Sequence, residues 1–347
     1  AMEGLPSELG RERFVEMSEG HPIAAAKASV PADARLRRRK AIDKAAKWII
    51  GAIASTAIAA VVLIFVFLVR EALPILTSSE VHEEVTLGKM LVAQEWRAGE
   101  PAQHVWQPVS KIPKYSLLPL LIGTLKVALI ALLFAVPVSV LGAVFTSELA
   151  PARLRELIKP AVELLAGIPS VVLGFFVLMV LATHLQDWLG LQFRLNSIVA
   201  GIGLGLTIVP VIFTLSEDAL TAVPRSYREA AFALGASRTR TALSVVLPAA
   251  FPGIFAAIVL GFGRAMGETM IVLMASGNAA ILSWDPTLPV RTVPATIAAE
   301  MGEVVVGGPH WTVLFVLGVL LLVLTIAFNS LSGWYVRRLR ANLGGAS

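Results

Sequence analysis

One arginine and one glutamate inside an apolar segment are the side chains of this sequence best placed to do chemistry. Arg264 and Glu268 lie within the run GFGRAMGETM at residues 261–270. An arginine within a membrane span costs about 2.5–3.5 kcal/mol on insertion scales, so it indicates a functional site unless it is neutralised locally. Their spacing of four residues predicts that the two side chains share one helix face, about one turn apart. They therefore either pair with each other or bind a ligand together.

The chemistry of this pair favours a tetrahedral oxyanion that carries a proton. The planar guanidinium of Arg264 matches two oxygens of such an anion. The carboxylate of Glu268 repels an anion, unless the anion offers an O–H group that the carboxylate can accept. Phosphate keeps at least one proton near neutral pH and sulfate keeps none, so the pair favours phosphate over sulfate. Thr269, the next residue in the run, is a further candidate for substrate binding.

Two other polar residues within apolar segments are weaker candidates for a substrate pathway. Lys126 lies in the second apolar segment, where its ammonium either faces the pathway or extends toward the outer interface. Ser170 follows Pro169, at a point where a broken helix would restart, so its N–H and hydroxyl either meet an anion or serve packing. The chain has no cysteine and five scattered histidines, which indicates no metal site and no cofactor.

These residues must be positioned by membrane-spanning helices, because the composition is typical of a membrane protein. Of the 347 residues, 56% are hydrophobic and 15% are charged, whereas soluble domains average about 25% charged residues. Apolar segments long enough to cross a bilayer, about 20 residues each, recur along the chain. They predict an all-α integral membrane protein with six transmembrane helices, at approximately 48–69, 117–144, 161–183, 197–216, 250–279 and 312–335.

The distribution of basic residues predicts the orientation of these helices. A run RLRRRK precedes the first span and a run RRLR follows the last. The loops 145–160 and 217–249 each carry several basic residues, whereas 184–196 and 280–311 carry one arginine each. This alternation follows the positive-inside rule and predicts that both termini are cytoplasmic. The net charge of +5 is explained by this topology, so nucleic-acid binding is not expected.

The predicted spans divide the chain into five parts. They are a basic cytoplasmic tail 1–46, a first transmembrane helix 47–70, an external segment 71–116, a main transmembrane domain 117–335 and a cytoplasmic tail 336–347. The external segment holds several basic residues, but long loops largely escape the charge rule. Its Trp96, Trp106 and Tyr115 are expected at the level of the lipid headgroups, where amphipathic rings are favoured.

The cytoplasmic loop 217–249, between the fourth and fifth spans, predicts a short helix, a sharp turn and a second helix. Alanine and leucine favour the first helix, which begins near Glu229. Gly235 can adopt a positive φ at the end of that helix. Ser237 can cap a second helix that runs to Pro248. Such a rigid element could transmit force if a partner protein has a matching groove.

The landmarks of this loop resemble the EAA loop of bacterial ABC import permeases. Glu-Ala-Ala at 229–231 is followed by Gly235, a β-branched residue at 245 and Leu-Pro at 247–248, each at the spacing of that loop. The resemblance implies an ABC type I importer permease fold. It also implies that an ATPase subunit is contacted by four residues of the loop, Glu229, Ala230, Ala231 and Gly235. The chain has no GxxxxGK[ST] motif, so ATP hydrolysis is expected in another polypeptide and not in this chain.

The wider sequence is similar to the PstC family of phosphate permeases. The matching stretches lie at 123–124, 135–139, 148–151, 163–170 and 263–270. The resemblance implies a heterodimer with a PstA-like permease, a dimer of ATPase subunits and an external phosphate-binding protein, all at the bacterial inner membrane. It also implies that Arg264 and Glu268 are critical for transport. Glu300 and Glu303, in an external loop, are candidates for contact with the binding protein.

Three other functions remain open from the sequence. The same architecture could carry another oxyanion, namely molybdate, sulfate or a phosphonate. An ion-coupled secondary transporter could use Arg264 and Glu268 as a proton-linked pair, but it would leave the EAA-like loop unexplained. A membrane scaffold that reports phosphate status to a sensor kinase is not distinguished from a transporter by any motif in the chain.

Overall fold

Six long apolar helices confirm the predicted number of spans. The computed structural model describes residues 32–95, 99 and 101–344, so most of the predicted tail 1–46 and the last three residues lie outside the described part. Within that part, the helices long and apolar enough to cross a bilayer are Arg39–Thr77, Leu118–Leu149, Ser170–Leu189, Ser197–Thr221, Arg238–Gly267 and Pro309–Tyr335. The chain divides into two units, Ala1–Phe65 and Val66–Ser347.

The first unit consists, in its described part, of the helix α1 (Ala32–Ala72), which continues into the second unit. Its apolar side chains are exposed around the helix, with Trp48 at 73% and Leu63 at 71%. A helix that is apolar on all faces suits a lipid environment or the interior of an assembly.

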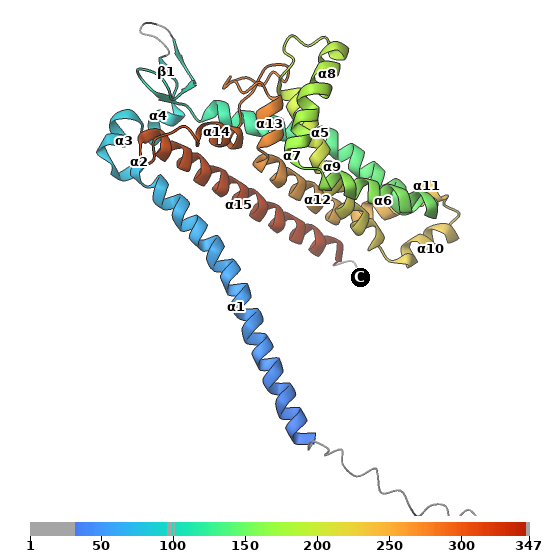
Figure 1. Ribbon diagram of the computed structural model, residues 1–347. Helices are drawn as coiled ribbons and strands as arrows, with labels where there is room; N and C mark the ends of the chain where they lie inside the picture. The colour runs from blue at the N-terminus through green and yellow to red at the C-terminus, as the bar shows by residue number, and fades with distance from the viewer. Residues whose placement is uncertain (1–31, 96–98, 100, 345–347) are drawn as a thin grey trace, which may run out of the picture. The chain divides into compact units, whose positions relative to one another are not determined.

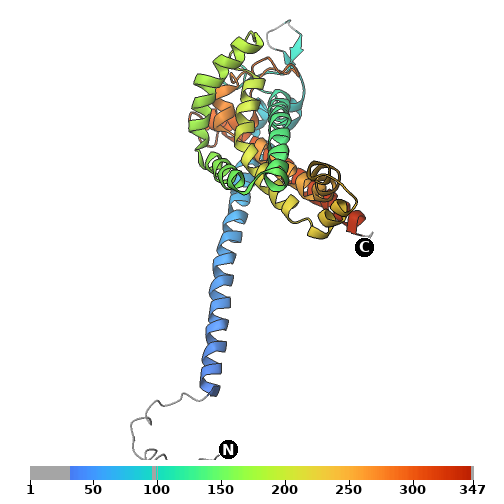
Figure 2. The ribbon, with the colours of Figure 1, turned by 90° about the vertical axis from the view of Figure 1, so that its right-hand side faces the viewer.

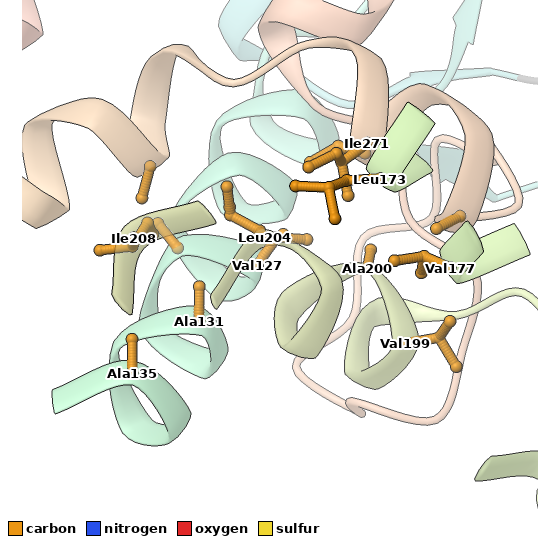
Figure 3. Packing of buried hydrophobic residues seen from close by; sticks show 14 of the residues in the cluster. Val127, Ala131, Ala135, Leu173, Val177, Val199, Ala200, Leu204, Ile208 and Ile271 are labelled. Carbon is orange, nitrogen blue, oxygen red and sulfur yellow. The ribbon is translucent and has the colours of Figure 1, made fainter. Parts of the chain in front are cut away.

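The core of the second unit forms where α5 (Leu118–Val144) packs along α9 (Ser197–Thr221). Small residues permit this close approach: Ala131 and Ala135 of α5 are fully buried beside Leu204 and Ile208 of α9 (Figure 3). At Gly201 of α9 an added Cβ would lie 2.5 Å from Cγ2 of Ile130. Close backbone packing through small residues is typical of helices in a bilayer.

Further helices surround this pair. The helix α12 (Leu247–Gly267) packs on α9 and on α15 (Pro309–Gly344), as Figure 1 shows. The short helices α7 (Ser170–Phe176) and α13 (Met270–Ala275) pack against each other and on α9. Three helices contain or adjoin a π-helical turn. These turns are η2 (Phe145–Leu149), η3 (Val177–Leu181, leading into α8, Ala182–Leu189) and η4 (Ala242–Val246).

Two predicted spans have the wrong limits. The third was expected at 161–183, but α6 (Ala152–Gly167) is a separate helix and the span begins at Ser170. Ile168 is extended, with ψ 126°, because it precedes Pro169 and the α conformation is disfavoured there. The fifth was expected at 250–279, but it starts at Arg238 and ends at Gly267.

Small elements of the external segment pack at one end of the second unit. They are α2 (Pro74–Thr77), α3 (Ser79–Glu84), α4 (Leu87–Leu91) and two antiparallel hairpins, β1 (Gln94–Glu95) with β2 (Ala102–Gln103) and β3 (Trp106–Gln107) with β4 (Lys114–Tyr115). The helix α14 (Val293–Glu300) lies at the same end, whereas α10 (Arg225–Ala233) and α11 (Arg238–Thr241) lie at the other (Figures 1 and 2).

Of the three rings expected at the headgroup level, Trp96 lies outside the described residues, and Trp106 and Tyr115 are core residues of the second unit. Both are buried, with 6% and 1% exposure, and their rings meet edge to face at 5.7 Å. Each polar tip has an internal acceptor: Trp106 Nε1 donates to Glu300, and Tyr115 Oη donates to Glu84 Oε1 at 2.6 Å. A satisfied polar tip lets an aromatic ring serve as a core residue.

Candidate functional site

The EAA-like loop forms a helix, a turn and a second helix, and the predicted roles of Gly235 in the turn and Ser237 as the helix cap are confirmed. The helix α10 ends at Ala233, and Gly235 has a φ of 80°, a conformation that costs a residue with a Cβ about 1–2 kcal/mol. Ser237 Oγ accepts a hydrogen bond from Arg240 N. The prediction that the second helix ends at Pro248 is wrong. The helix runs from Arg238 through η4 into α12, because Pro248 lies in the first turn of α12 after the π-helical turn.

Both polar and apolar side chains are exposed on α10 and on the turn that follows it. Of the four residues predicted to contact an ATPase subunit, Glu229, Ala230 and Gly235 are exposed, while Ala231 is buried at 7% and packs within the chain. Three large side chains extend this surface, with exposures of 53%, 46% and 89%: Tyr227, Phe232 and Leu234. We call these three residues the α10 knob. Large apolar side chains exposed on a loop outside the spans are candidates for protein contacts.

An ion pair between Glu148 and Arg228 holds α10 to the rest of the chain. Arg228 Nη2 donates to Glu148 Oε1 at 2.6 Å, and Nε donates to Oε2 at 3.1 Å. The two side chains are 11% and 19% exposed. The hydrogen bond to Glu148 raises the pKa of Arg228 above its usual value. The sequence does not predict this pair, since 80 positions separate the two residues.

A second ion pair lies at the same end of the second unit. Lys159 of α6 approaches Glu217 of α9 at 3.0 Å, and the Glu217 side chain is only 6% exposed. The contact with the Glu217 carboxylate raises the pKa of Lys159. Both ion pairs therefore join helices that are distant in the sequence.

The prediction that Arg264 and Glu268 share one helix face is wrong. The helix α12 ends at Gly267, Glu268 is extended with φ −72° and ψ 132°, and α13 begins at Met270 after Thr269. Neither the Arg264 nor the Glu268 side chain makes a hydrogen bond or an ion pair within the described part of the chain. Arg264 is exposed, and Glu268 and Thr269 are half-buried. The self-neutralised pair is therefore not formed.

The helix start predicted at Ser170 is confirmed. This helix, α7, is a neighbour of α13, which begins directly after the non-helical residues Glu268 and Thr269. The helix α7 begins at Ser170, which is half-buried. The same helix packs on α13 so closely that a Cβ at Gly174 would lie 3.3 Å from the Cα of Ile271. Two helices that begin inside the bundle, at Ser170 and after Thr269, are therefore neighbours.

Lys126 binds a loop of its own chain. Its side chain is buried, with 3% exposure, and Nζ donates to Ser283 O at 2.9 Å and to Asp285 O at 3.0 Å. Two residues earlier, Thr124 Oγ1 accepts from Val293 N at 3.0 Å. This part of α5 therefore binds the segment between α13 and α14 and the start of α14. The Lys126 ammonium thus contacts a loop of its own chain, which is neither of the two positions predicted for it.

Glu300 lies in a polar network and not on an accessible loop. Its carboxylate accepts from Trp106 Nε1 at 3.0 Å and Arg291 Nη1 at 2.7 Å, and it lies 2.9 Å from His310 Nε2. Only 14% of its side chain is exposed, whereas Glu303 is exposed. Of the two candidates for contact with a binding protein, Glu303 alone is available at the surface.

Comparisons with known proteins identify the family of this chain. Residues 135–341 match the family described as binding-protein-dependent transport system inner membrane component. The chain is 33% identical to the phosphate transport system permease protein PstC of Mesorhizobium japonicum, over 69% of this chain and 78% of that protein. It is 36% identical to the phosphate transport system permease protein PstC 1 of Mycobacterium tuberculosis, over 71% and 80%.

A solved structure supports the fold. The chain resembles a bacterial ABC transporter involved in the import of the acidic polysaccharide alginate, with a TM-score of 0.58 and 14% identity, over 86% of this chain and 99% of the other. At that identity the likeness concerns the fold alone. With the six apolar helices, it agrees with a multi-pass protein of the inner membrane. The chain belongs to the family of binding-protein-dependent transport system inner membrane components, as a permease subunit of an ABC importer.

Proposed function

We propose that this chain is the transmembrane permease subunit of an ATP-driven importer of inorganic phosphate. The names of its relatives support phosphate as the substrate. The observation that carries the proposal is Arg264, which is exposed within the span Arg238–Gly267 and has no ionic partner in the described part of the chain. A charged side chain in a bilayer faces a bundle interior or a water-filled cavity, and in this proposal the group that Arg264 binds there is the transported anion.

The helix break beside Arg264 supplies complementary groups. Non-helical backbone at membrane depth is tolerated only where protein or a water-filled cavity satisfies it. The half-buried Glu268 and Thr269 lie on that break. The guanidinium donates hydrogen bonds to anionic oxygens, and the carboxylate accepts one from a protonated oxygen. Phosphate offers both kinds of oxygen, whereas sulfate offers only the first.

The proposal assigns the remaining partners to different parts of the second unit. In this proposal α10 and both termini are cytoplasmic, and the α10 knob docks on one subunit of an ATPase dimer. A PstA-like permease completes the pathway on the side to which Arg264 is exposed. An external phosphate-binding protein delivers its ligand at the end that carries α14 and the hairpins, and Ser170 lines the pathway near the helix break.

Uptake by the assembled transporter tests the proposal. Arg264→Lys keeps the charge but removes the planar fork, and charged hydrogen bonds contribute about 1.5–3 kcal/mol, so uptake of labelled phosphate should fall on the order of 10- to 100-fold. Glu268→Gln should weaken the preference for phosphate over sulfate. Arg153→Lys, at an exposed arginine of α6, serves as the control. Unchanged preference in the glutamine variant, or uptake that continues without the ATPase subunits, would count against the proposal.

A further inference from the structure

The ion pair between Glu148 and Arg228 joins three elements at the α10 end of the second unit. Besides its two bonds to Glu148 of η2, Arg228 donates to Leu220 O at 2.9 Å and to Val223 O at 2.7 Å. Leu220 belongs to α9, and Val223 follows it. The Arg228 guanidinium on α10 therefore binds both the end of α9 and the turn η2, which directly follows α5.

The Glu148 side of this contact is fixed from a second direction. Arg155 of α6 donates through Nε to Thr146 O at 2.8 Å and through Nη2 to Ser147 O. The turn η2 is thus held by one arginine at its backbone carbonyls and by another at its Glu148 carboxylate. A displacement of α10 cannot leave η2 behind without breaking the charged contacts of Arg228.

The π-helical turn η2, which both arginines contact, has two features of a segment that can change its conformation. A π-helical turn holds one more residue than an α-helical turn, and such turns are frequent at functional sites. The hydroxyls of Thr146 and Ser147 in η2 are buried without a hydrogen-bond partner, and so is that of Thr241, next to η4. Buried hydroxyls without a hydrogen-bond partner are uncommon in folded proteins. A change of register in η2 would give these groups new neighbours.

We propose that Glu148 and Arg228 are positioning residues that make α5 move together with α10 during the transport cycle. This inference rests on the proposed function, because it assumes an ATPase that moves α10. The continuous helix from Arg238 to Gly267 carries motion to the Arg264 site directly. The Glu148–Arg228 pair adds a second route, through η2 into α5 and through Leu220 into α9. Neither residue contacts the substrate.

The test uses the whole transporter in vesicles, with the ATPase and binding-protein partners present. Arg228→Met and Glu148→Gln each break the pair. We expect both variants to retain the ATPase subunits and to hydrolyse ATP, but to take up at least about tenfold less phosphate per ATP. The exchanged double variant, Glu148→Arg with Arg228→Glu, should recover at least half of the lost uptake per ATP. Arg153→Met, at an exposed arginine on α6, should behave as the parent protein.

A motion readout separates coupling from a purely structural role. The chain has no cysteine, so Leu141→Cys on α5, exposed at 63%, accepts a single nitroxide label. Its spectrum should change on ATP binding in the parent and stay constant in Arg228→Met. If Arg228→Met does not assemble, Arg228→Lys replaces it, with an expected intermediate loss.

Two results would overturn the inference. In one, the single variants keep uptake per ATP within twofold of the control. In the other, uptake falls only in proportion to the amount of assembled complex, and the label still responds to ATP. A failure of the proposed function is distinct from both, because the parent protein itself would then take up no phosphate.

Discussion

A methyl group added at Gly123 should displace the segment between α13 and α14. The ideal Cβ at this position would lie 2.2 Å from Arg291 O and 2.7 Å from Val290 Cγ2. The nearer atom is a backbone carbonyl, so no side-chain rotation relieves the clash. Arg291 must move away from α5 by about 1 Å to reach an ordinary van der Waals contact.

The loss of stability follows from the hydrogen bonds that the same part of α5 makes to this segment and to the start of α14. The bonds from Lys126 Nζ to two carbonyls measure 2.9 and 3.0 Å, and the bond accepted by Thr124 measures 3.0 Å. A shift of about 1 Å takes these contacts beyond hydrogen-bonding distance. Neutral bonds contribute about 1 kcal/mol and charged ones about 1.5–3 kcal/mol. With partial relaxation, we expect Gly123→Ala to cost about 3–4 kcal/mol, or a fall in Tm on the order of 10 °C.

The assay combines thermal unfolding in detergent with thiol labelling. Val293→Cys places the single thiol of the chain at a fully buried position that begins α14. The thiol should be protected in the otherwise unchanged protein and should react at least about tenfold faster when Gly123→Ala is added, because the displaced segment exposes α14. Gly88→Ala is the control, since nothing lies within 4 Å of a Cβ there. A Tm within about 2 °C of the parent, together with full protection of the thiol, would refute the reasoning.

Three further perturbations address the knob, the lysine and the polar network. Leu234→Glu places a charge on the most exposed residue of the α10 knob; retention of the ATPase subunits in a pull-down should fall at least about tenfold with Tm unchanged, and full retention would argue against docking there. Lys126→Met should speed amide exchange over 281–287 at least about tenfold, and unchanged exchange would contradict its anchoring role. Burial opposes ionisation of Glu300, but hydrogen bonds from His310 and Trp106 outweigh it, so the pKa of Glu300 is lowered. The ionised carboxylate therefore stabilises the fold fully at pH values above the ordinary pKa of a glutamate, about 4.5. This stabilisation is lost as the pH falls through the lowered pKa. Glu300→Gln should lower Tm at pH 7 and flatten the acid side of the Tm profile, and an unchanged profile would refute this contribution.

Local features were predictable from the sequence. The number of spans follows from apolar length, the turn at Gly235 from its freedom to adopt a positive φ, and the cap at Ser237 from its hydroxyl. The helix restart at Ser170 follows from the proline before it. Each of these depends on residues within a few positions of one another.

Contacts between distant segments were not predictable in this way. Lys126 binds a carbonyl 157 positions away, and Glu148 binds an arginine 80 positions away. The end of the fifth span at Gly267 was also missed, because the apolar pattern continues to 279 and conceals the break. These features depend on tertiary packing that neither periodicity nor short motifs record.

Phosphate uptake by vesicles that contain the complete transporter tests the central claim most directly. Labelled phosphate should accumulate only when ATP is supplied on the side of the ATPase subunits, and a large excess of sulfate or molybdate should leave the rate unchanged. Accumulation driven by an ion gradient without ATP would contradict the coupling role of α10. Equal competition by sulfate would contradict the assignment of Arg264 and Glu268 to a protonated oxyanion.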